Sequence, residues 1–249
     1  MTSTTTPVVR TLTTPDELGQ ATTLYRDVFG YTDLRQGASP RLLTALRDNG
    51  GSVVGARDGD RVIAFAFGFQ ATDGTSSYHY SQAAVVHPSH QGCGLGRALK
   101  SAQREVALGW GVTRMRWTYD PLIARNAHFN LDVLGAVARW FHGGFYDDDS
   151  DRLLVDWDLG TDPGSRAPAQ DDPPADLGDW ARPVSDGDRI WLPIPSDYTA
   201  LAARDPLHAA RVRTDLAAAL APLMNDGWAA VSCLPYTPQT ALYRLERAL

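Results

Sequence analysis

A glycine-rich turn between an apolar strand and an amphipathic helix is the feature that most constrains the fold of this chain. The segment VVHPSHQGCGLGRALKSAQ, residues 85–103, places Gly92, Gly94 and Gly96 within five positions. Glycine weakens regular structure, so this density indicates a backbone that turns sharply or lies very close to another group. Backbone amides can converge in such a turn, and the N-terminus of the following helix adds partial positive charge. We therefore expect an anion site that suits a phosphate or pyrophosphate.

The residues around this turn separate it from better-known phosphate motifs. Arg97 and Lys100 fall in the first turns of the helix, where we expect them to meet further phosphate oxygens. Gly96 is followed by Arg-Ala rather than Lys-Ser/Thr, and the glycine spacing differs from the dinucleotide fingerprint G-x-G-x-x-G. A tight strand–helix turn without a ligand stays open as the alternative, because short glycine patterns are weak evidence.

Composition excludes several other classes of protein. A net charge of −6 over 249 residues argues against nucleic acid as the main partner. Two cysteines, Cys93 and Cys233, are too few for a disulfide framework and favour reduced thiols. The N-terminus does not resemble a secretory signal, and no apolar run approaches the ~18 residues of a membrane span. We expect a cytoplasmic protein with no nucleic-acid or membrane partner.

Periodicity and turn signals predict an α/β fold of the α+β kind, a mixed sheet with helices on its faces. The expected helices cover residues 14–29, 39–50, 95–106, 126–135 and 205–223. The expected strands cover 8–12, 77–86, 112–119, 136–141, 152–159 and 190–195, with hairpins at 51–69 and 227–248. We expect a core over 1–159, a Pro/Asp/Gly-rich linker or loop over 160–188, and a C-terminal α/β extension over 189–249 that completes the same globule.

Residues 86–96, VHPSHQGCGLG, resemble the acyl-CoA loop of the GNAT acyltransferase superfamily, written Q/R-x-x-G-x-G/A. The preceding V-x-P and the order of elements match as well. The resemblance implies a GNAT-like fold with its C-terminal extension, in which the loop amides bind the coenzyme A pyrophosphate and the preceding strand pairs with the pantetheine arm. It implies that the cofactor-binding residues are Ala84, Val85, Val86, Gln91, Gly92, Cys93, Gly94, Leu95, Gly96, Arg97 and Ala98.

A second run, WTYDPL, NAHFN and LG within residues 117–135, is similar to a GNAT subfamily that carries W-T-F/Y-D-P-L-x-x-x-N-A-x-F-N-x-x-x-L-G. Many of its members are known only as predicted acetyltransferases, and some are associated with N-succinylation of amino acids. The resemblance implies an N-acyltransferase with acetyl-CoA or another acyl-CoA, such as succinyl-CoA, as donor. We expect a small-molecule amine as acceptor, and an amino acid would suit. A non-catalytic acyl-CoA-binding sensor, a protein N-acetyltransferase and a homodimer stay open.

Direct attack of an amine on the thioester needs an oxyanion donor and an acid for the departing thiolate. The backbone amide of Val86, or one beside it, is the natural oxyanion donor. In many GNAT enzymes a tyrosine on the helix after the fifth strand is the acid, and Leu131 occupies that position here. The sequence departs from the family there, so Tyr119 and Tyr146 become the candidate substitutes.

The base has two candidates, each with a plainer alternative. Asp120 and His87 follow the fifth and fourth predicted strands. Asp120 precedes a proline and would equally stabilise a turn, and His87 would equally be an exposed loop residue. His87, His90 and Cys93 have metal-like spacing but lack a fourth ligand, so we expect no metal.

Polar residues beyond the fifth strand are candidates for substrate contacts. Asn126 and Asn130 are four residues apart, so we expect them on one helical face, bonded to coenzyme A, to the acceptor or to local backbone. Arg125 would hold a substrate carboxylate through its guanidinium fork. Arg114 and Arg116, on one face of a strand, share that chemistry. For all three arginines, binding of the coenzyme A phosphates or solvation of the surface stays open as the alternative.

Overall fold

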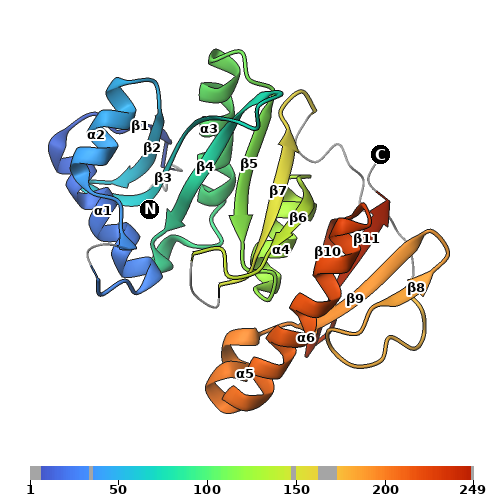
Figure 1. Cartoon of the computed structure of the whole chain (residues 1–249). Helices are drawn as coiled ribbons and strands as arrows, with labels where there is room; N and C mark the ends of the chain where they lie inside the picture. The colour runs from blue at the N-terminus through green and yellow to red at the C-terminus, as the bar shows by residue number, and fades with distance from the viewer. Residues whose placement is uncertain (1–6, 34–35, 147–149, 162–172, 248–249) are drawn as a thin grey trace, which may run out of the picture. The chain divides into compact units, whose positions relative to one another are not determined.

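The computed structural model describes residues 7–33, 36–146, 150–161 and 173–247, and the chain divides into two compact units (Figure 1). The first unit covers residues 1–117 and the second 118–249. The core predicted over 1–159 is thus shared between two units, whose boundary falls inside a strand, β5 (Arg114–Tyr119).

The first unit forms the mixed sheet that the sequence predicts. Its strands lie in the order β1-β2-β3-β4-β5, antiparallel except for the parallel pair β4–β5. These strands are β1 (Arg10–Thr11), β2 (Ser52–Asp58), β3 (Arg61–Thr72), β4 (Ser77–Val86) and β5. The helices are α1 (Pro15–Phe29), α2 (Pro40–Asp48) and α3 (Leu95–Gly109), with a 3₁₀ turn, η2, at Pro88–His90. The first strand is shorter than the predicted 8–12.

Alternating side chains of β2–β4 supply two separate cores, one on each face of this sheet. Val53, Phe65, Phe67, Ala83 and Val85 pack with buried residues of α1 and α2. The intervening side chains pack against α3 on the opposite face; they are Val54, Ala56, Ile63, Ala64 and Ala66, with Leu95 and Leu99 from the helix. Both faces of the sheet are therefore covered. Strand β4 leads directly into the turn that begins α3.

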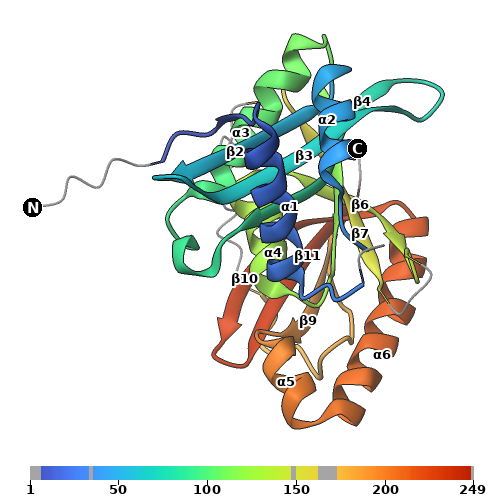
Figure 2. The same ribbon diagram turned by 90° about the vertical axis from the view of Figure 1, so that its left-hand side faces the viewer.

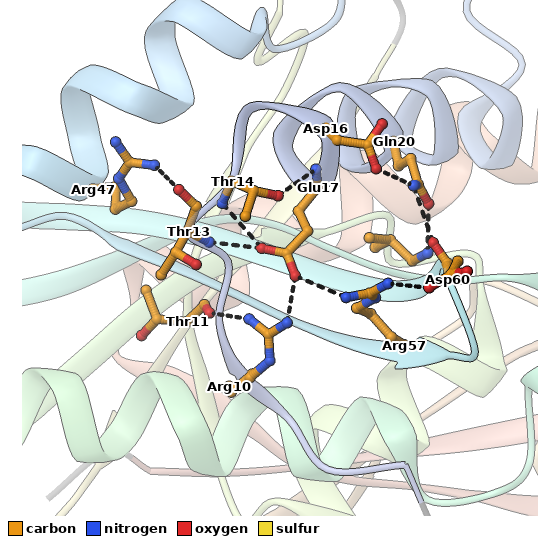
Figure 3. A network of polar contacts seen from close by, with 11 residues as sticks. Arg10, Thr11, Thr13, Thr14, Asp16, Glu17, Gln20, Arg47, Arg57 and Asp60 are labelled. Atoms are coloured by element: carbon orange, nitrogen blue, oxygen red, sulfur yellow. Dashed lines mark hydrogen bonds and ion pairs between the residues drawn. The ribbon is translucent and has the colours of Figure 1, made fainter.

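The start of α1 is tied to β1 and β2 through one carboxylate (Figure 3). Glu17 and Thr14 form a capping box, and Glu17 also accepts hydrogen bonds from Arg10 and from the amide of Thr13. Arg57 of β2 lies 3.5 Å from the same carboxylate. Burial raises the pKa of Glu17, but the bonds from Arg10 and the two backbone amides outweigh it and lower the pKa to about 2. Glu17 therefore stays ionised, and its carboxylate anchors the start of α1.

The second unit contains an antiparallel sheet in the order β7-β6-β10-β11-β9-β8. Its strands are β6 (Val137–His142), β7 (Arg152–Asp158), β8 (Val184–Asp186), β9 (Arg189–Pro195), β10 (Trp228–Thr237) and β11 (Thr240–Arg247). Its helices are α4 (Ala124–His128), continued by a π turn, η3 (Phe129–Val133), then α5 (Tyr198–Arg204) and α6 (Pro206–Asn225). Figure 2 shows α5 and α6 side by side.

Two short elements depart from the sequence prediction. Helix α5 begins where the Asp197 carboxylate accepts from the amide of Ala200, and its seven residues are too few to show a periodicity. Strand β8 lies inside the segment 160–188 that we predicted as linker, and it pairs with β9. Residues 162–172 of that segment lie outside the described residues. Within the described ranges, no helix is both long and apolar enough to cross a membrane.

Candidate functional site

The turn before α3 has the geometry of an anion site. Gly92 and Gly94 adopt left-handed φ angles of +77° and +81°, which explains why these positions are glycine. Gly94 caps α3 without a side-chain hydrogen bond to the helix, so the amides of Leu95 and Gly96 have no partner within the helix. Gly96 lies inside α3, so a left-handed turn accounts for only two of the three glycines. Exposed backbone N–H groups at a helix N-terminus bind anions.

The loop between β4 and α3 is held by a hydrogen bond to β3 and by contacts among its own residues. The amide of His87 donates to the carbonyl of Ile63 at 2.8 Å, which continues the pairing of β4 with β3. The side chain of Gln91 turns back and donates to the carbonyl of Val86 at 3.1 Å. The exposed thiol of Cys93 lies 3.7 Å from the carbonyl of Gln91. These contacts fix the conformation of the loop between β4 and α3.

One edge of β4 is open beside this loop. Successive amides of a strand point in opposite directions, so the bond from His87 toward β3 makes Val86 and Ala84 point away from β3. On that side β4 pairs with β5 at only two positions, His79–Met115 and Tyr80–Arg116. Val85 instead packs its side chain into the core beneath α1. The predicted oxyanion donor, the amide of Val86, thus faces the open edge.

Lys100 is not a phosphate ligand, which corrects the sequence prediction. The side chain is 3% exposed; its amine donates to Ser81 Oγ at 2.9 Å and lies 3.7 Å from the centre of the Trp117 ring. Burial lowers the pKa of this amine well below its usual value of 10.5. The helical periodicity of α3 turns Lys100 toward the sheet, whereas Arg97 is exposed. Of the two cations that the sequence predicts as phosphate contacts, Arg97 is the exposed one.

Lys100 lies at one end of a series of buried, hydrogen-bonded polar side chains beneath α3. Ser81 donates to Gln103 at 2.8 Å, Gln103 donates to Ser52 at 3.4 Å, and Ser52 lies 2.7 Å from Nε2 of His79. Burial and the nearby Lys100 lower the pKa of His79 to about 3, so its ring is neutral. No carboxylate takes part in this chain, which therefore buries an amine without a counter-charge.

His87 borders a hollow of about 570 Å³ beside α1. Its Nδ1 accepts a hydrogen bond from the amide of Ser89 and lies 2.7 Å from Ser89 Oγ. An Nδ1 that accepts leaves the proton of the neutral ring on Nε2. The side chain thus offers a donor, not a base. Asp16 and Asp27 of α1 line the same hollow.

Asp120, the other predicted base, has both carboxylate oxygens engaged. Oδ1 accepts from the amide of Leu122 at 2.9 Å, which closes the turn after β5. Oδ2 pairs with Arg213 of α6 at 3.0 Å. The turn-stabilising alternative accounts for the first contact, and the arginine from the C-terminal segment was not foreseen.

The two candidate tyrosines differ in their surroundings. Tyr119 is 5% exposed, and its hydroxyl lies 3.3 Å from that of Tyr243, which donates a hydrogen bond to the carbonyl of Pro121 at 2.9 Å. Burial raises the pKa of Tyr119 strongly, so it stays protonated. Tyr146 is exposed and packs edge-on against Phe145. Leu131, where the family has tyrosine, is buried.

The predicted substrate contacts on α4 are only partly brought together. Arg125 and Asn126 are exposed, but Asn130 is buried, since the α-helix ends at His128 and a π turn alters the rotation of later residues. Arg116 is engaged by Asp73 at 3.0 Å. Among the three arginines predicted to meet a substrate carboxylate, Arg125 is exposed, whereas Arg114 and Arg116 are half-buried.

Sequence reasoning missed one cluster, in which Asp132 accepts hydrogen bonds from β10 and contacts His128. The His–Asp spacing of four residues was the signal that could have found it. Within the described ranges, no three His, Cys, Asp or Glu side chains are placed to hold a metal.

The comparisons with known proteins agree with this geometry. Residues 18–129 match the model of the acetyltransferase (GNAT) family. Solved structures with the same fold include Arabidopsis thaliana NAA60 bound to a bisubstrate analogue, at TM-score 0.52 and 15% identity over 61% of this chain and 98% of that one. They also include yncA from Salmonella typhimurium with its cofactor acetyl-CoA, at TM-score 0.51 and 20% identity over 62% of this chain and 95% of that one.

A third such structure is aminoglycoside 6'-acetyltransferase type Ii, at TM-score 0.50 and 15% identity over 63% of this chain and 99% of that one. The search of curated proteins found no match. The family match and these structures confirm the mixed α/β GNAT fold over residues 18–160, with a further C-terminal region of strands and helices.

Proposed function

We propose that this protein transfers an acetyl group from acetyl-CoA to the amine of a small molecule. The observation that carries the proposal is the junction of β4, a left-handed glycine turn and the uncapped N-terminus of α3, in residues that match the GNAT family model. Gly92, Gly94 and the first amides of α3 would bind the pyrophosphate, with Arg97 meeting further phosphate oxygens.

The open edge of β4 supplies the next part of the proposed site. The amides of Ala84 and Val86 point away from β3, so they are placed to pair with an extended pantetheine arm. The amide of Val86 would then stabilise the oxyanion that forms when the amine attacks the thioester carbonyl. His87 would donate from Nε2 to a phosphate or to the substrate. The departing thiolate takes its proton from Tyr119, Tyr146 or solvent.

Arg125 gives the proposed acceptor a chemical class. It is exposed on α4 and carries a planar fork that pairs with carboxylates. We expect Arg125→Ala to raise the KM for a carboxylated amine about tenfold. The KM for an uncharged amine and for acetyl-CoA should change less than twofold. An equal loss on every substrate would assign Arg125 to coenzyme A binding or to structure.

A thiol-release assay tests the proposed function. Purified protein is incubated with acetyl-CoA or succinyl-CoA and a panel of amino acids, other small amines and peptides with free N-termini. Acceptor-dependent release of free thiol with small amines supports the proposal. Release with peptides alone would make the protein a protein N-acetyltransferase. Calorimetric binding of coenzyme A without thiol release for any amine would leave a non-catalytic binding protein.

A further inference from the structure

A hollow of about 530 Å³ in the second unit is lined by one face of α6 and by residues 178–182, which precede β8. The residues of α6 in this lining are His208, Arg211, Val212 and Asp215, and their spacing places them on one side of the helix. Pockets for small molecules have volumes of roughly 300–1,000 Å³ and combine aromatic side chains with a few polar groups. The hollow therefore has the size and the kind of lining of a ligand site.

The aromatic part of the lining is Trp180, which one hydrogen bond and one ring contact hold in place. Its Nε1 donates to Oγ1 of Thr240 at 3.0 Å, so the one polar atom of the indole is already bonded. The imidazole of His208 stacks on the indole, with ring centres 5.8 Å apart and planes 27° apart. Both residues are half-buried, so part of each ring stays accessible. Trp180 therefore offers a ligand its flat apolar surface, on which a planar ring stacks well.

The charged part of the lining leaves one guanidinium available. Arg182 lies 3.6 Å from the carboxylate of Asp215, whereas no carboxylate among the described residues pairs with the exposed Arg211. A guanidinium fork pairs with the two oxygens of a carboxylate or with a phosphate. Asp179 also lines the hollow and is exposed. Because Asp179 and Asp215 offset the two arginines, the lining favours one anionic group at Arg211 over a polyanion.

The turn that carries Trp180 contains a strained residue. Ala181 has a left-handed φ of +63°, and within the described ranges it is the only residue other than glycine with a positive φ. Such outliers are uncommon, and they concentrate at active sites and ligand clamps. The buried Ala181 is held by the hydrogen bond from its amide to the carbonyl of Pro193 at 2.8 Å. Its two neighbours, Trp180 and Arg182, both line the hollow, so the strained turn holds a ring and a charge at one site.

We propose that this hollow binds a small molecule in which a planar aromatic ring carries one carboxylate or phosphate group. The ring lies against Trp180, and the anionic group pairs with Arg211. The inference goes beyond the proposed function and does not depend on it. Every residue of the lining belongs to the second unit, and none is among the residues proposed to bind coenzyme A or the acceptor.

Calorimetry on the full chain tests the proposal with matched probes. Indole-3-acetate and adenosine 5'-monophosphate carry a ring and an anion, 3-methylindole and adenosine carry the ring alone, and acetate and inorganic phosphate carry the anion alone. We expect a ring–anion probe to bind at least about tenfold more tightly than its own ring or anion. Whether the carboxylate probe, the phosphate probe or both bind identifies the kind of anion. Binding of neither, or equal affinity for the anion alone, overturns the proposal.

Two arginine variants separate the hollow from the rest of the surface. Arg211→Gln should weaken the ring–anion probe about tenfold and leave its matched ring unchanged, because only the charged contact is removed. Arg204→Gln, at an exposed arginine of α5 outside the lining, should bind as wild type. Trp180→Leu should weaken the probe and its matched ring alike, by about tenfold, because it removes the stacking surface. Equal losses in Arg211→Gln and Arg204→Gln would contradict binding in this hollow.

Proton–nitrogen NMR locates the probe in the unchanged protein. The indole N–H signal of Trp180, assigned from Trp180→Phe, should shift when the ring–anion probe is added, whereas that of Trp228 on β10, outside the lining, should not. This readout and Arg211→Gln decide the question even if Trp180→Leu does not fold. Gly94→Glu, in the glycine turn of the first unit, should leave the affinity of the probe within twofold. Loss of binding in Gly94→Glu, or an unshifted Trp180 signal, overturns the inference and leaves the proposed acetyltransferase function standing.

Discussion

The two units of the molecule assemble their polar sites in different ways. In the first unit the candidate anion site is one continuous stretch, residues 84–98, in which the Gln91 side chain bonds to its near neighbour Val86. In the second unit two carboxylates contact residues about a hundred positions away, Asp132 with Ser232 and Asp120 with Arg213. A local site follows from backbone conformation, whereas a distributed one depends on how distant elements pack.

The units also differ in how they bury ionisable groups. Beneath α3, the amine of Lys100 meets only a hydroxyl and an aromatic ring. In the second unit, Asp132 accepts from a hydroxyl and an amide, and Asp120 meets an arginine. Burying an amine without a counter-charge costs free energy, while a carboxylate held by several hydrogen bonds can orient a neighbouring side chain. The buried Lys100 amine therefore lowers the stability of the first unit, whereas the bonded carboxylates of the second unit can position neighbouring side chains.

The largest expected effect tests the local site. Gly94→Glu puts a carboxylate at the N-terminus of α3 in a left-handed conformation, so coenzyme A affinity should fall at least about 100-fold by calorimetry. Gly94→Ala is the matched control, because it introduces the same backbone strain, about 1 kcal/mol, without the charge. Unchanged affinity in Gly94→Glu would remove the pyrophosphate from this turn.

The next largest effect tests the ion pair of Asp120 and Arg213, two residues far apart in the sequence. Asp120→Asn retains an acceptor for the Leu122 amide but leaves Arg213 without its charged partner. Chemical denaturation should show a loss of about 1–2 kcal/mol in the free energy of unfolding, with kcat reduced less than threefold. The double variant with Arg213→Met should lose less than the sum of the single variants. A 100-fold fall in kcat at unchanged stability would make Asp120 the base after all.

A smaller expected effect distinguishes the roles of Arg97 and Lys100, two cationic residues of α3, in coenzyme A binding. Arg97→Ala should weaken coenzyme A binding about tenfold because it removes an exposed charge beside the proposed phosphates. Lys100→Met should leave that affinity within twofold, since the Lys100 amine is buried against Ser81 and Trp117. Calorimetric titration of the two variants under one buffer gives the comparison, and equal losses would return Lys100 to the phosphate site.

The smallest effect concerns stability and its dependence on pH. Lys100→Met keeps the side-chain volume and removes a buried amine, so it should raise the free energy of unfolding by about 1 kcal/mol at pH 7. The lowered pKa of Lys100 means that the unfolded chain binds this proton more readily. Wild-type stability should therefore rise with pH up to 10.5, the usual lysine value, and the difference between the two proteins should shrink. A constant difference from pH 7 to 10.5 would contradict the lowered pKa.

Most of the first unit could be predicted from local rules. Thr14, Pro15 and Glu17 mark the start of α1, Ser39 and Pro40 that of α2, and the structure has both helices where these residues place them. The glycine turn before α3 follows from the same reasoning, because left-handed φ angles at Gly92 and Gly94 are a property of the local backbone. The resemblance to GNAT acyltransferases, which the family match supports over residues 18–129, depends on this stretch.

Side-chain partners were decided by the tertiary structure. The position of Lys100 within the first turns of a helix predicts a phosphate contact, but only the packing of α3 on the sheet shows that the amine turns inward. Asp132 and His128 are four residues apart in the sequence, yet the tautomer of the ring depends on a carbonyl of β10 more than a hundred residues away. Helix and turn signals act between neighbours, whereas protonation and burial depend on groups that meet only when the chain has folded.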